Sequence, residues 1–175
     1  SSLNAGPGDG RLWTWRQEAS FRRTALKAAC FFMKRDYPDR PLIGVGAVIV
    51  DGGRVVVVRR AHEPLKGEWS IPGGVLEIGE TLRAGAAREA LEETGLAVEA
   101  GEVLEVLDRI VRDGEGRIQF HYVLVDFLCR PTGGELHAGG DAEAARWITA
   151  SDLEAFPIAD SAAAVLRKGL ERAER

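Results

Sequence analysis

The stretch from Pro72 to Gly95 constrains the fold of this chain more than any other part of its sequence. A proline and two glycines open it, and a helical pattern then runs from about Thr81 to Thr94, where Gly95 ends the helix. Three glutamates on this helix stand at positions i, i+3 and i+4, so their carboxylates project from one side. We expect the opposite side to pack against a sheet. Its residues are Ala87, Ala90 and Leu91.

Segments rich in β-branched residues flank this helix and predict the sheet. Leu42 to Val50 and Val55 to Arg60 are joined by an Asp-Gly-Gly-Arg sequence, so they predict a β-hairpin. After the helix, Val103 to Arg112 and Ile118 to Arg130 predict two strands joined by a glycine-rich turn, and Arg146 to Thr149 predicts a short last strand.

Two short helices are expected to close the chain, because Ser151 and Asp160 are both good N-cap residues. Hairpins with helices between and after them are typical of an α/β fold in which a mixed β-sheet lies between helices. The sequence therefore predicts one such domain over residues 41–175.

Residues 1–40 differ from this domain and predict an N-terminal arm. The first ten residues are small and polar, with three glycines and a proline, which is typical of a flexible terminus. From Trp13 to Met33 apolar residues recur at helical spacing, so a helix is expected there. Its aromatic residues make this helix a candidate contact for a homodimer. Arg22 and Arg23 before a short apolar run also resemble an export signal, although Lys27 interrupts that run.

Charge is unevenly distributed between the two parts. Residues 11–40 carry eight basic and three acidic side chains, whereas residues 41–175 carry 15 basic and 23 acidic ones. An acidic domain repels a nucleic-acid backbone, so nucleic acid is not an expected partner. No apolar run approaches the ~20 residues that cross a bilayer, so no membrane span is expected. Cys30 and Cys129 lie far apart without Cys or His neighbours at ligand spacing, which fits a reducing, cytoplasmic compartment.

The three glutamates of the helix, Glu89, Glu92 and Glu93, predict a metal site. Like charges at this spacing destabilise a helix unless something neutralises them. Converging carboxylate oxygens suit a hard divalent cation, Mg²⁺ before Ca²⁺, because positions remain for water and a substrate phosphate. A solvated acidic face on a surface helix is the alternative. The glycine-rich loop and Glu80 upstream favour the metal site.

The same residues resemble a known family signature. From Gly74 the chain reads Gly, five residues, Glu80, seven residues, and then Arg-Glu-Ala-Leu-Glu-Glu-Thr-Gly-Leu, which ends at Leu96. This is similar to the Nudix box, G-x5-E-x7-R-E-U-x-E-E-x-G-U, in which U is a bulky apolar residue; Ala90 is a small residue at such a position. The box covers residues 74–96, and the order of elements around it extends the resemblance to residues 41–172.

The resemblance to Nudix hydrolases implies an α/β/α sandwich and Mg²⁺-dependent hydrolysis of a nucleoside diphosphate linked to another group, with Mn²⁺ as a substitute metal. Carried over position by position, it also implies a set of metal ligands and a pair that braces the loop against the helix. The ligands are Glu89, Glu92, Glu93 and a backbone carbonyl of Gly73 or Gly74, and the pair is Glu80 with Arg88.

The general base that activates water has two expected sources. A box carboxylate, Glu92 or Glu93, is one of them. Related enzymes take the base from a late loop, and here Glu143 is the first candidate and Asp141 the second. That Glu143 is a plain surface acid is an equal alternative, since only its position argues for a role.

Substrate recognition is expected from the strand and loop that precede the box. Basic and aromatic residues there can meet an anionic phosphate or stack on a base, although each alone also fits a surface or packing role. They are Arg59, Arg60, His62, Lys66 and Trp69.

Residues 65–74 resemble both small ADP-ribose hydrolases and nucleotide-pool sanitising enzymes that act on nucleoside triphosphates. We favour ADP-ribose or a similar nucleotide sugar. A third alternative is a Nudix-fold sensor that binds such a metabolite without cleaving it, but such sensors usually lose box acids, and all of these acids are present here. The expected function is therefore a diphosphohydrolase that acts on a small nucleotide.

Overall fold

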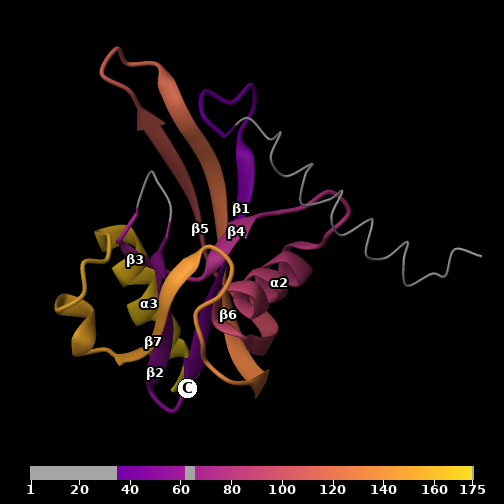
Figure 1. Cartoon of the computed structure of the whole chain (residues 1–175), viewed down its shortest axis with the longest axis vertical. Coiled ribbons are helices and arrows are strands. Elements are labelled where there is room, and N and C mark those ends of the chain that lie inside the picture. The colour runs from indigo at the N-terminus through magenta and orange to yellow at the C-terminus, as the bar shows by residue number, and fades with distance from the viewer. Residues whose placement is uncertain (1–34, 62–65, 175) are drawn as a thin grey trace, which may run out of the picture. The chain divides into compact units, whose positions relative to one another are not determined.

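In the residues that the computed structural model describes, 35–61 and 66–174, a seven-stranded sheet is organised around β1 (Leu42–Asp51) (Figure 1). Neighbouring strands follow the order β3, β2, β1, β6, β5; β4 also pairs with β1, and β7 pairs with β2. The other strands are β2 (Arg54–Arg60), β3 (Trp69–Ser70), β4 (Gly73–Val75), β5 (Leu96–Arg112), β6 (Ile118–Gly134) and β7 (Ala142–Thr149). The helices are α2 (Leu82–Thr94), the 3-10 helix η1 (Asp152–Glu154) and α3 (Asp160–Ala173).

β1 joins two groups of strands because it changes partners along its length. Its last two residues pair antiparallel with β2 across a turn at Gly52 and Gly53, whose φ angles of 54° and 73° favour glycine. From Leu42 to Ile49, β1 runs parallel to β6, and its Gly44–Gly46 stretch pairs antiparallel with β4. β5 and β7 run antiparallel to β6 and β2. The predicted mixed sheet is confirmed.

Both faces of β1 are buried, because alternate side chains of a strand point to opposite sides of the sheet. On the α2 side β1 contributes Val45, Ala47 and Ile49, and α2 contributes Ala86 and Ala90. On the α3 side β1 contributes Val48 and Val50, and α3 contributes Val165, Leu166 and Leu170. Figure 1 shows the two helices on opposite faces of the strands. The expected α/β/α sandwich is therefore confirmed.

The predicted hairpin and central helix begin and end within one residue of β1, β2 and α2. The later strands are longer than predicted: β5 already begins at Leu96, β6 continues to Gly134 and β7 begins at Ala142. Glutamates interrupt the apolar pattern in the extensions of β5 and β7, and the β6 extension is a Pro-Thr-Gly-Gly sequence typical of a turn, so the sequence does not mark them as strand. β3 and β4 were not predicted, because each is very short and β4 consists mainly of glycine.

Ser151 occupies the predicted N-cap position, before η1, although its side chain makes no capping hydrogen bond, whereas the predicted N-cap at Asp160 is wrong. Asp152, rather than Ser151, stabilises the short η1 turn: its carboxylate accepts hydrogen bonds from the N–H and the hydroxyl of Thr149, each at 2.8 Å. Asp160 is the first residue of α3, and Ala159 occupies the N-cap position without a side-chain hydrogen bond. Asp160 instead places a negative charge in the first turn, where the helix dipole favours it.

The predicted helix at Trp13–Met33 lies outside the described residues, together with most of the predicted arm. Tyr37 is tied to the β5–β6 hairpin: its N–H donates to the Gln119 carbonyl at 2.8 Å, and its hydroxyl donates to Asp113 at 2.9 Å. None of the described helices is both long enough and apolar enough to span a membrane.

Gly169 allows α3 to approach β1 closely, which can be tested by substitution. A Cβ atom there would lie 2.5 Å from Val48 Cγ1 and 3.3 Å from Leu104 Cδ1. We expect Gly169→Ala to lower the free energy of unfolding by about 1–3 kcal/mol, although alanine favours a helix by about 1 kcal/mol over glycine. Urea denaturation followed by circular dichroism measures the change, with Gly114→Ala, which points into open space, as the control. A variant more stable than the parent would show that helix propensity outweighs the steric conflict.

Candidate active site

β4 brings the backbone of two glycines against both β1 and α2. Gly73 pairs with Gly46, and Gly74 pairs with Val45. A side chain at Gly73 would collide with the carbonyl oxygen of Val45, and one at Gly74 would collide with the carboxylate of Glu89. These close approaches explain why the strand carries glycine, and they hold the loop before α2 within reach of the carboxylates of the helix.

The ends of α2 fix where its glutamates point. Thr81 is the N-cap, and its hydroxyl accepts a hydrogen bond from the Ala84 N–H at 3.2 Å. At the other end Gly95 has a φ of 70° and donates its N–H to the Leu91 carbonyl at 3.0 Å. Both ends agree with the sequence prediction.

Arg88 ties the loop to the helix. Its Nε and Nη2 donate to the two carboxylate oxygens of Glu80 at 2.7 and 3.0 Å, a bidentate pair. Nη1 donates to Glu89 at 2.7 Å, and Nη2 also reaches the Val75 carbonyl at 3.2 Å. The Arg88 guanidinium lowers the pKa of Glu80, so Glu80 stays ionised and keeps its place in the loop.

Glu93 lies on the buried side of α2, so the expected separation into a charged side and a packed side is wrong. Glu93 is 6% exposed and stands one helical turn beyond the fully buried Ala90. Leu91, which was expected to pack on the sheet, is 53% exposed. The N–H of Gly73 donates to Glu93 Oε2 at 2.9 Å, which gives the buried carboxylate a backbone partner.

Burial raises the pKa of Glu93 to about 7, because the charged form loses its hydration. The Gly73 N–H opposes this shift, and the negative charges of Glu89 and Asp141 add to it. Burial also raises the pKa of Glu89, although Arg88 opposes the shift. Acids from α2 and from the loop before β7 therefore share one electrostatic environment.

The loop before β7 lies against the C-terminal end of α2. The N–H of Gly139 donates to the Glu93 carbonyl at 3.1 Å, and a side chain at Gly139 would lie 2.6 Å from the Glu92 carbonyl oxygen. Gly140 has a φ of 56°, which favours glycine. The glycine pair before Asp141 is the sequence signal for this close approach, although it does not say which side chain of the loop faces the helix.

The two late-loop acids have different surroundings. Asp141 raises the pKa values of both Glu89 and Glu93, so its charge lies near theirs. Glu143 instead pairs with Arg59, whose Nε lies 2.6 Å from Glu143 Oε1. The structure thus brings together Asp141 and the buried glutamates of α2, and it gives Glu143 a different partner.

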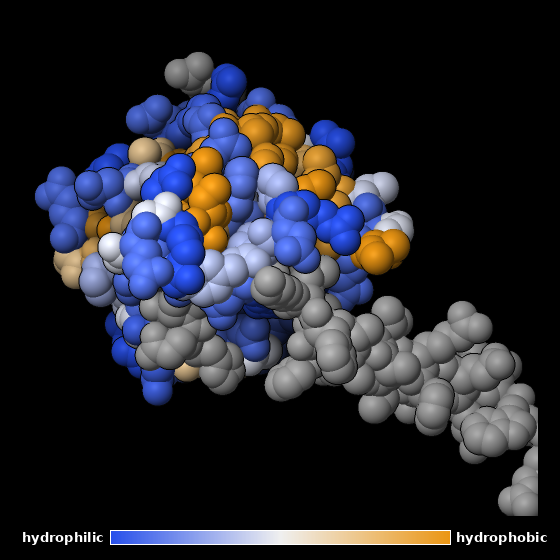
Figure 2. Space-filling model, turned by 90° about the horizontal axis from the view of Figure 1, so that it is seen from above, coloured by the Kyte–Doolittle hydropathy of each residue, from blue (hydrophilic) through white to orange (hydrophobic). Residues whose placement is uncertain are grey.

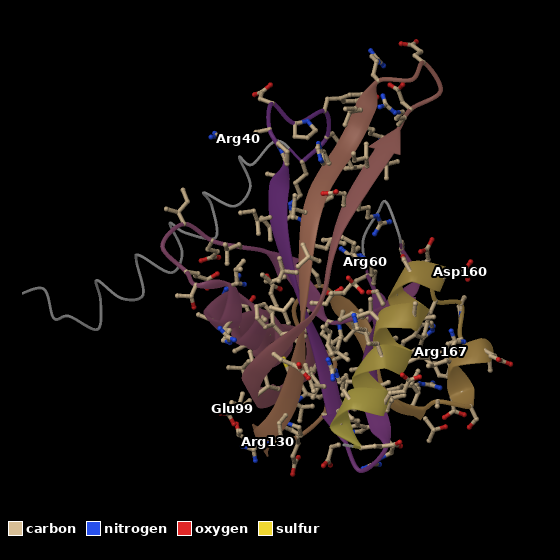
Figure 3. All side chains as sticks on the ribbon, turned by 180° about the vertical axis from the view of Figure 1, so that it is seen from behind. Arg40, Arg60, Glu99, Arg130, Asp160 and Arg167 are labelled. Carbon is tan, nitrogen blue, oxygen red and sulfur yellow. The ribbon has the colours of Figure 1, made fainter. Side chains whose placement is uncertain are left out.

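The two predicted substrate residues on β2, Arg59 and Arg60, lie on opposite faces of the strand. Arg60, which is labelled in Figure 3, lowers the pKa of Glu93, so its positive charge reaches the carboxylates of α2. The preceding residue, Arg59, pairs in register with Trp69, and its guanidinium carbon lies 5.7 Å from the centroid of that ring. Adjacent residues of a strand point to opposite faces, so one predicted group becomes two.

Trp69 does not offer the open stacking surface that the sequence suggested. Its side chain belongs to the α3-side core, is 7% exposed and meets Phe156 edge to face at a centroid distance of 5.0 Å. Lys66 is exposed at the edge of the described chain, and His62 lies outside the described residues.

Comparisons with known proteins identify the family. The family model described as the NUDIX domain matches residues 40–169, which is most of the chain. The chain belongs to the Nudix hydrolase family.

Several Nudix relatives carry names that bear on substrate. The chain is 34% identical over 113 residues to an ADP-ribose pyrophosphatase of Methanocaldococcus jannaschii, a match that covers 65% of this chain and 64% of that protein. It is 39% identical over 113 residues to a putative 8-oxo-dGTP diphosphatase 2 of Mycobacterium tuberculosis, over 63% of this chain and 75% of that protein. The solved structure of an ADP-ribose pyrophosphatase from Streptococcus suis matches with a TM-score of 0.60 and 26% identity, over 78% of this chain and 94% of that one. The chain spans just under two thirds of the length of the archaeal relative.

Nudix proteins generally use a divalent metal such as Mg²⁺, and the donors of this domain suit such an ion. Carboxylates that raise one another's pKa gain stability from a divalent cation, and the absence of a side chain at Gly74 lets the Glu89 carboxylate approach the backbone of β4. Glu92 is exposed, with its Oε2 3.7 Å from Arg88 Nη1. Within the described chain, no three acidic, His or Cys side chains are already grouped to hold an ion.

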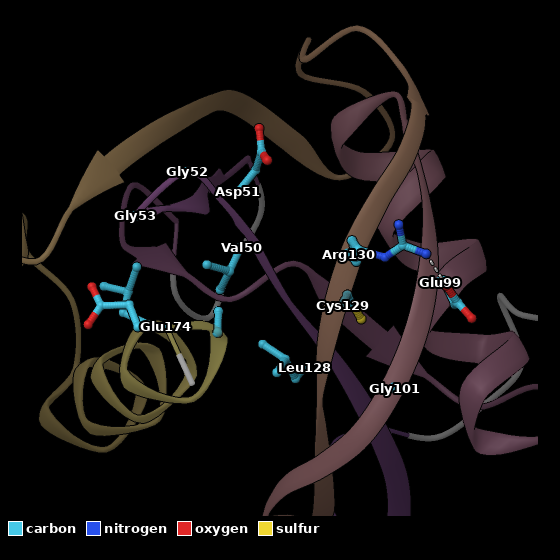
Figure 4. Close-up of a pocket in the computed structure, with 12 residues that line it drawn as sticks. Val50, Asp51, Gly52, Gly53, Glu99, Gly101, Leu128, Cys129, Arg130 and Glu174 are labelled. Atoms are coloured by element: carbon cyan, nitrogen blue, oxygen red, sulfur yellow. Dashed lines mark hydrogen bonds and ion pairs between the residues drawn. The ribbon is translucent and has the colours of Figure 1, made fainter.

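A cavity of about 480 Å³ lies away from these residues, beside the β1–β2 turn (Figure 4). Leu128 and Leu170 form apolar parts of its wall, and the ion pair between Glu99 and Arg130, with 2.6 Å between Oε2 and Nη2, lies at its side. None of the residues predicted for catalysis, metal binding or substrate binding lines it. The cavity is therefore not part of the candidate active site.

The raised pKa of Glu93 makes the stability of the Nudix domain depend on pH. Its folded value, about 7, lies above the ordinary value of 4.5, so the folded state binds more protons and stability falls as the pH rises from about 4.5 through 7. In the presence of EDTA, we expect the parent to lose on the order of 2 kcal/mol more than Glu93→Gln between pH 5 and pH 8. Glutamine can still accept the Gly73 hydrogen bond, so the variant removes the charge and keeps the contact.

Urea denaturation at the two pH values measures this difference, and Glu154→Gln, an exposed acid on η1, is the control. Equal pH dependence of the parent and Glu93→Gln would contradict a raised pKa at Glu93.

Proposed function

We propose that this Nudix domain hydrolyses the diphosphate linkage of a nucleoside diphosphate derivative, with ADP-ribose or a similar nucleotide sugar as the favoured substrate. The observation that carries the proposal is the pair of mutually repelling carboxylates of Glu93, which is buried, and Glu89, which is partly buried; Asp141 adds its charge to them. Residues that serve stability alone rarely bury like charges together, whereas perturbed acids are typical of catalytic sites.

Mg²⁺, or Mn²⁺ in its place, would be held by Glu89, Glu92, Glu93 and the backbone carbonyl of Gly74. When bound, such an ion neutralises the phosphate oxygens and lowers the pKa of a coordinated water. The chain's own part is to keep the carboxylates in position. The bidentate Arg88–Glu80 pair does so for the loop, and the Gly73 N–H does so for Glu93.

The proton and the phosphate are handled by residues at the end of β2 and in the loop before β7. A carboxylate oxygen of Asp141 would take the proton from the attacking water, in preference to Glu143, because the charge of Asp141 acts on Glu89 and Glu93, whereas the Glu143 carboxylate is directed to Arg59. Arg60 would bind a phosphate oxygen, since its charge already reaches Glu93. Glu92 and Glu93 are alternative bases within the box.

Two kinds of relative support two substrate classes. Similarity to ADP-ribose pyrophosphatases supports the nucleotide sugar, and it includes a solved structure that is matched over 94% of its length. Similarity to the M. tuberculosis protein supports a second candidate, a nucleoside triphosphate pyrophosphohydrolase that removes damaged nucleotides. The proposed partner in either case is a small nucleotide. We also propose that the catalytic unit is the 41–175 domain, as the family match over residues 40–169 supports.

A substrate panel tests the proposal. Purified protein is incubated with ADP-ribose, other nucleoside diphosphate sugars, 8-oxo-dGTP and dGTP, each with Mg²⁺, Mn²⁺ or EDTA. Phosphate is measured after coupling to a phosphatase for the diphosphate sugars and to inorganic pyrophosphatase for the triphosphates. We expect metal-dependent turnover of ADP-ribose to exceed that of the triphosphates. The Glu92→Gln/Glu93→Gln double variant should lower kcat by about three orders of magnitude or more, because it removes two anionic metal ligands.

Circular dichroism and thermal unfolding check that the double variant is folded. Preferred cleavage of 8-oxo-dGTP would move the assignment to the second candidate. Near-parental activity in the folded double variant would overturn the assigned role of the box acids.

A comparison of the two late-loop acids tests the source of the base. We expect Asp141→Asn to lower kcat by about 100-fold or more, because it removes the acid beside Glu89 and Glu93. Glu143→Gln should cost less than about 10-fold, since it breaks only the pair with Arg59. Steady-state kinetics as a function of pH measure both, and the opposite ranking would restore Glu143 as the base.

A further inference from the structure

β5 has an outer edge that pairs with no other strand in the part of the chain that the structure describes. Its only strand neighbour there is β6, and the ladder between them is regular from Glu105 to Val111. Figure 1 shows the outer half of this hairpin extending beyond both helices. The exposed N–H and C=O groups of such an edge can pair with another chain.

Exposed apolar side chains follow this edge. Val106 and Ile110 are 57% and 48% exposed, and both share the face of Val125, which belongs to the α2-side core. Figure 2 shows apolar patches among charged side chains on the side of the molecule that carries the hairpin. The exposed Asp108 lies between Val106 and Ile110 on the same face. Exposed apolar side chains beside an unpaired edge are typical of an interface.

The charges along β5 are complementary to those of a second, antiparallel copy of the same strand, which indicates such a copy as the partner. Arg109 is exposed and has no ion-pair partner among the described residues, while Glu105, on the same face, is 41% exposed and binds Lys168 at 3.0 Å. These two residues stand symmetrically about Leu107. We propose that two copies of this chain associate through antiparallel pairing of β5 with β5, on a twofold axis at Leu107.

This register places two opposite-charge pairs across the interface, while Asp108 of each copy lies across from Val106 of the other. Glu105 of one copy lies across from Arg109 of the other, twice per dimer, and the two Leu107 side chains meet on the axis. On the other face Val106 becomes a diagonal neighbour of Val106 and Ile110 in the second copy, within reach for apolar contact. Both exposed apolar side chains are then partly covered.

Neighbouring registers that keep the same faces aligned are less favourable. An axis at Asp108, at Glu105 or at Arg109 places identical charges directly opposite each other, which destabilises the pairing. An axis at Val106 places Glu105 against Leu107 and leaves Arg109 without an acid. Among axes at residues 105 to 109, the one at Leu107 is therefore the register that pairs opposite charges and opposes no identical ones.

Charge exchange tests the interface in the full-length protein. Analytical ultracentrifugation between about 1 and 100 μM should detect a dimer of the parent protein. Arg109→Glu places two Glu–Glu pairs in the interface, and Glu105→Arg places two Arg–Arg pairs, so each should weaken dimerisation by about 10-fold or more. Arg167→Glu, on α3 (Figure 3), makes the same charge change away from β5 and should leave the dimer unchanged.

Mixing the two single variants separates pairing from folding defects. A heterodimer of Glu105→Arg with Arg109→Glu contains only opposite-charge pairs, so the 1:1 mixture should dimerise within about threefold of the parent, as should the doubly exchanged chain. A monomeric parent would overturn the proposal. So would a dimer that neither single variant weakens, which would place the contact elsewhere, such as on residues 1–34, or a mixture that remains monomeric.

Discussion

The contact of β4 with β1 and α2 is the constraint on which the candidate site depends. Gly73 and Gly74 carry no side chains, so their backbone fits between Val45 and the carboxylate of Glu89, and the Gly73 N–H reaches Glu93. A larger residue at either position would push the loop from the helix. The box therefore encodes the carboxylates together with the narrow gap in which they work.

Burial of the Glu93 carboxylate sets the electrostatic character of that gap. A single backbone N–H partly replaces the lost hydration, and the nearby negative charges oppose ionisation further. Such an arrangement stabilises the fold less than a neutral side chain does above pH 7, and a nearby cation would relieve the repulsion. The bidentate Arg88–Glu80 pair offsets part of the strain because it anchors the loop without neutralising Glu93.

Local sequence patterns were sufficient to predict much of the fold. The β1–β2 hairpin and α2 follow from β-branched runs, a Gly-Gly turn and a glycine C-cap, all of which act over a few residues. Leu91 and Glu93 were misplaced for a different reason. The tertiary contact with β4 determines which side of α2 faces the sheet, and this contact cannot be inferred from the neighbouring residues of the helix.

The candidate substrate and base residues were also difficult to place from sequence, because their positions depend on how the strands pair in the sheet. Arg59 and Arg60 are adjacent in sequence, yet strand alternation gives one to Trp69 and Glu143 and the other to the carboxylates of α2. Conversely, Asp141 lies 48 positions after Glu93 in the sequence, but the Gly139–Gly140 turn brings its charge within range of Glu93. The face of β2 on which a residue lies therefore decides whether its charge reaches the carboxylates of the box. By that criterion Arg59 and Glu143 would affect catalysis only through the packing of Trp69 and the loop before β7.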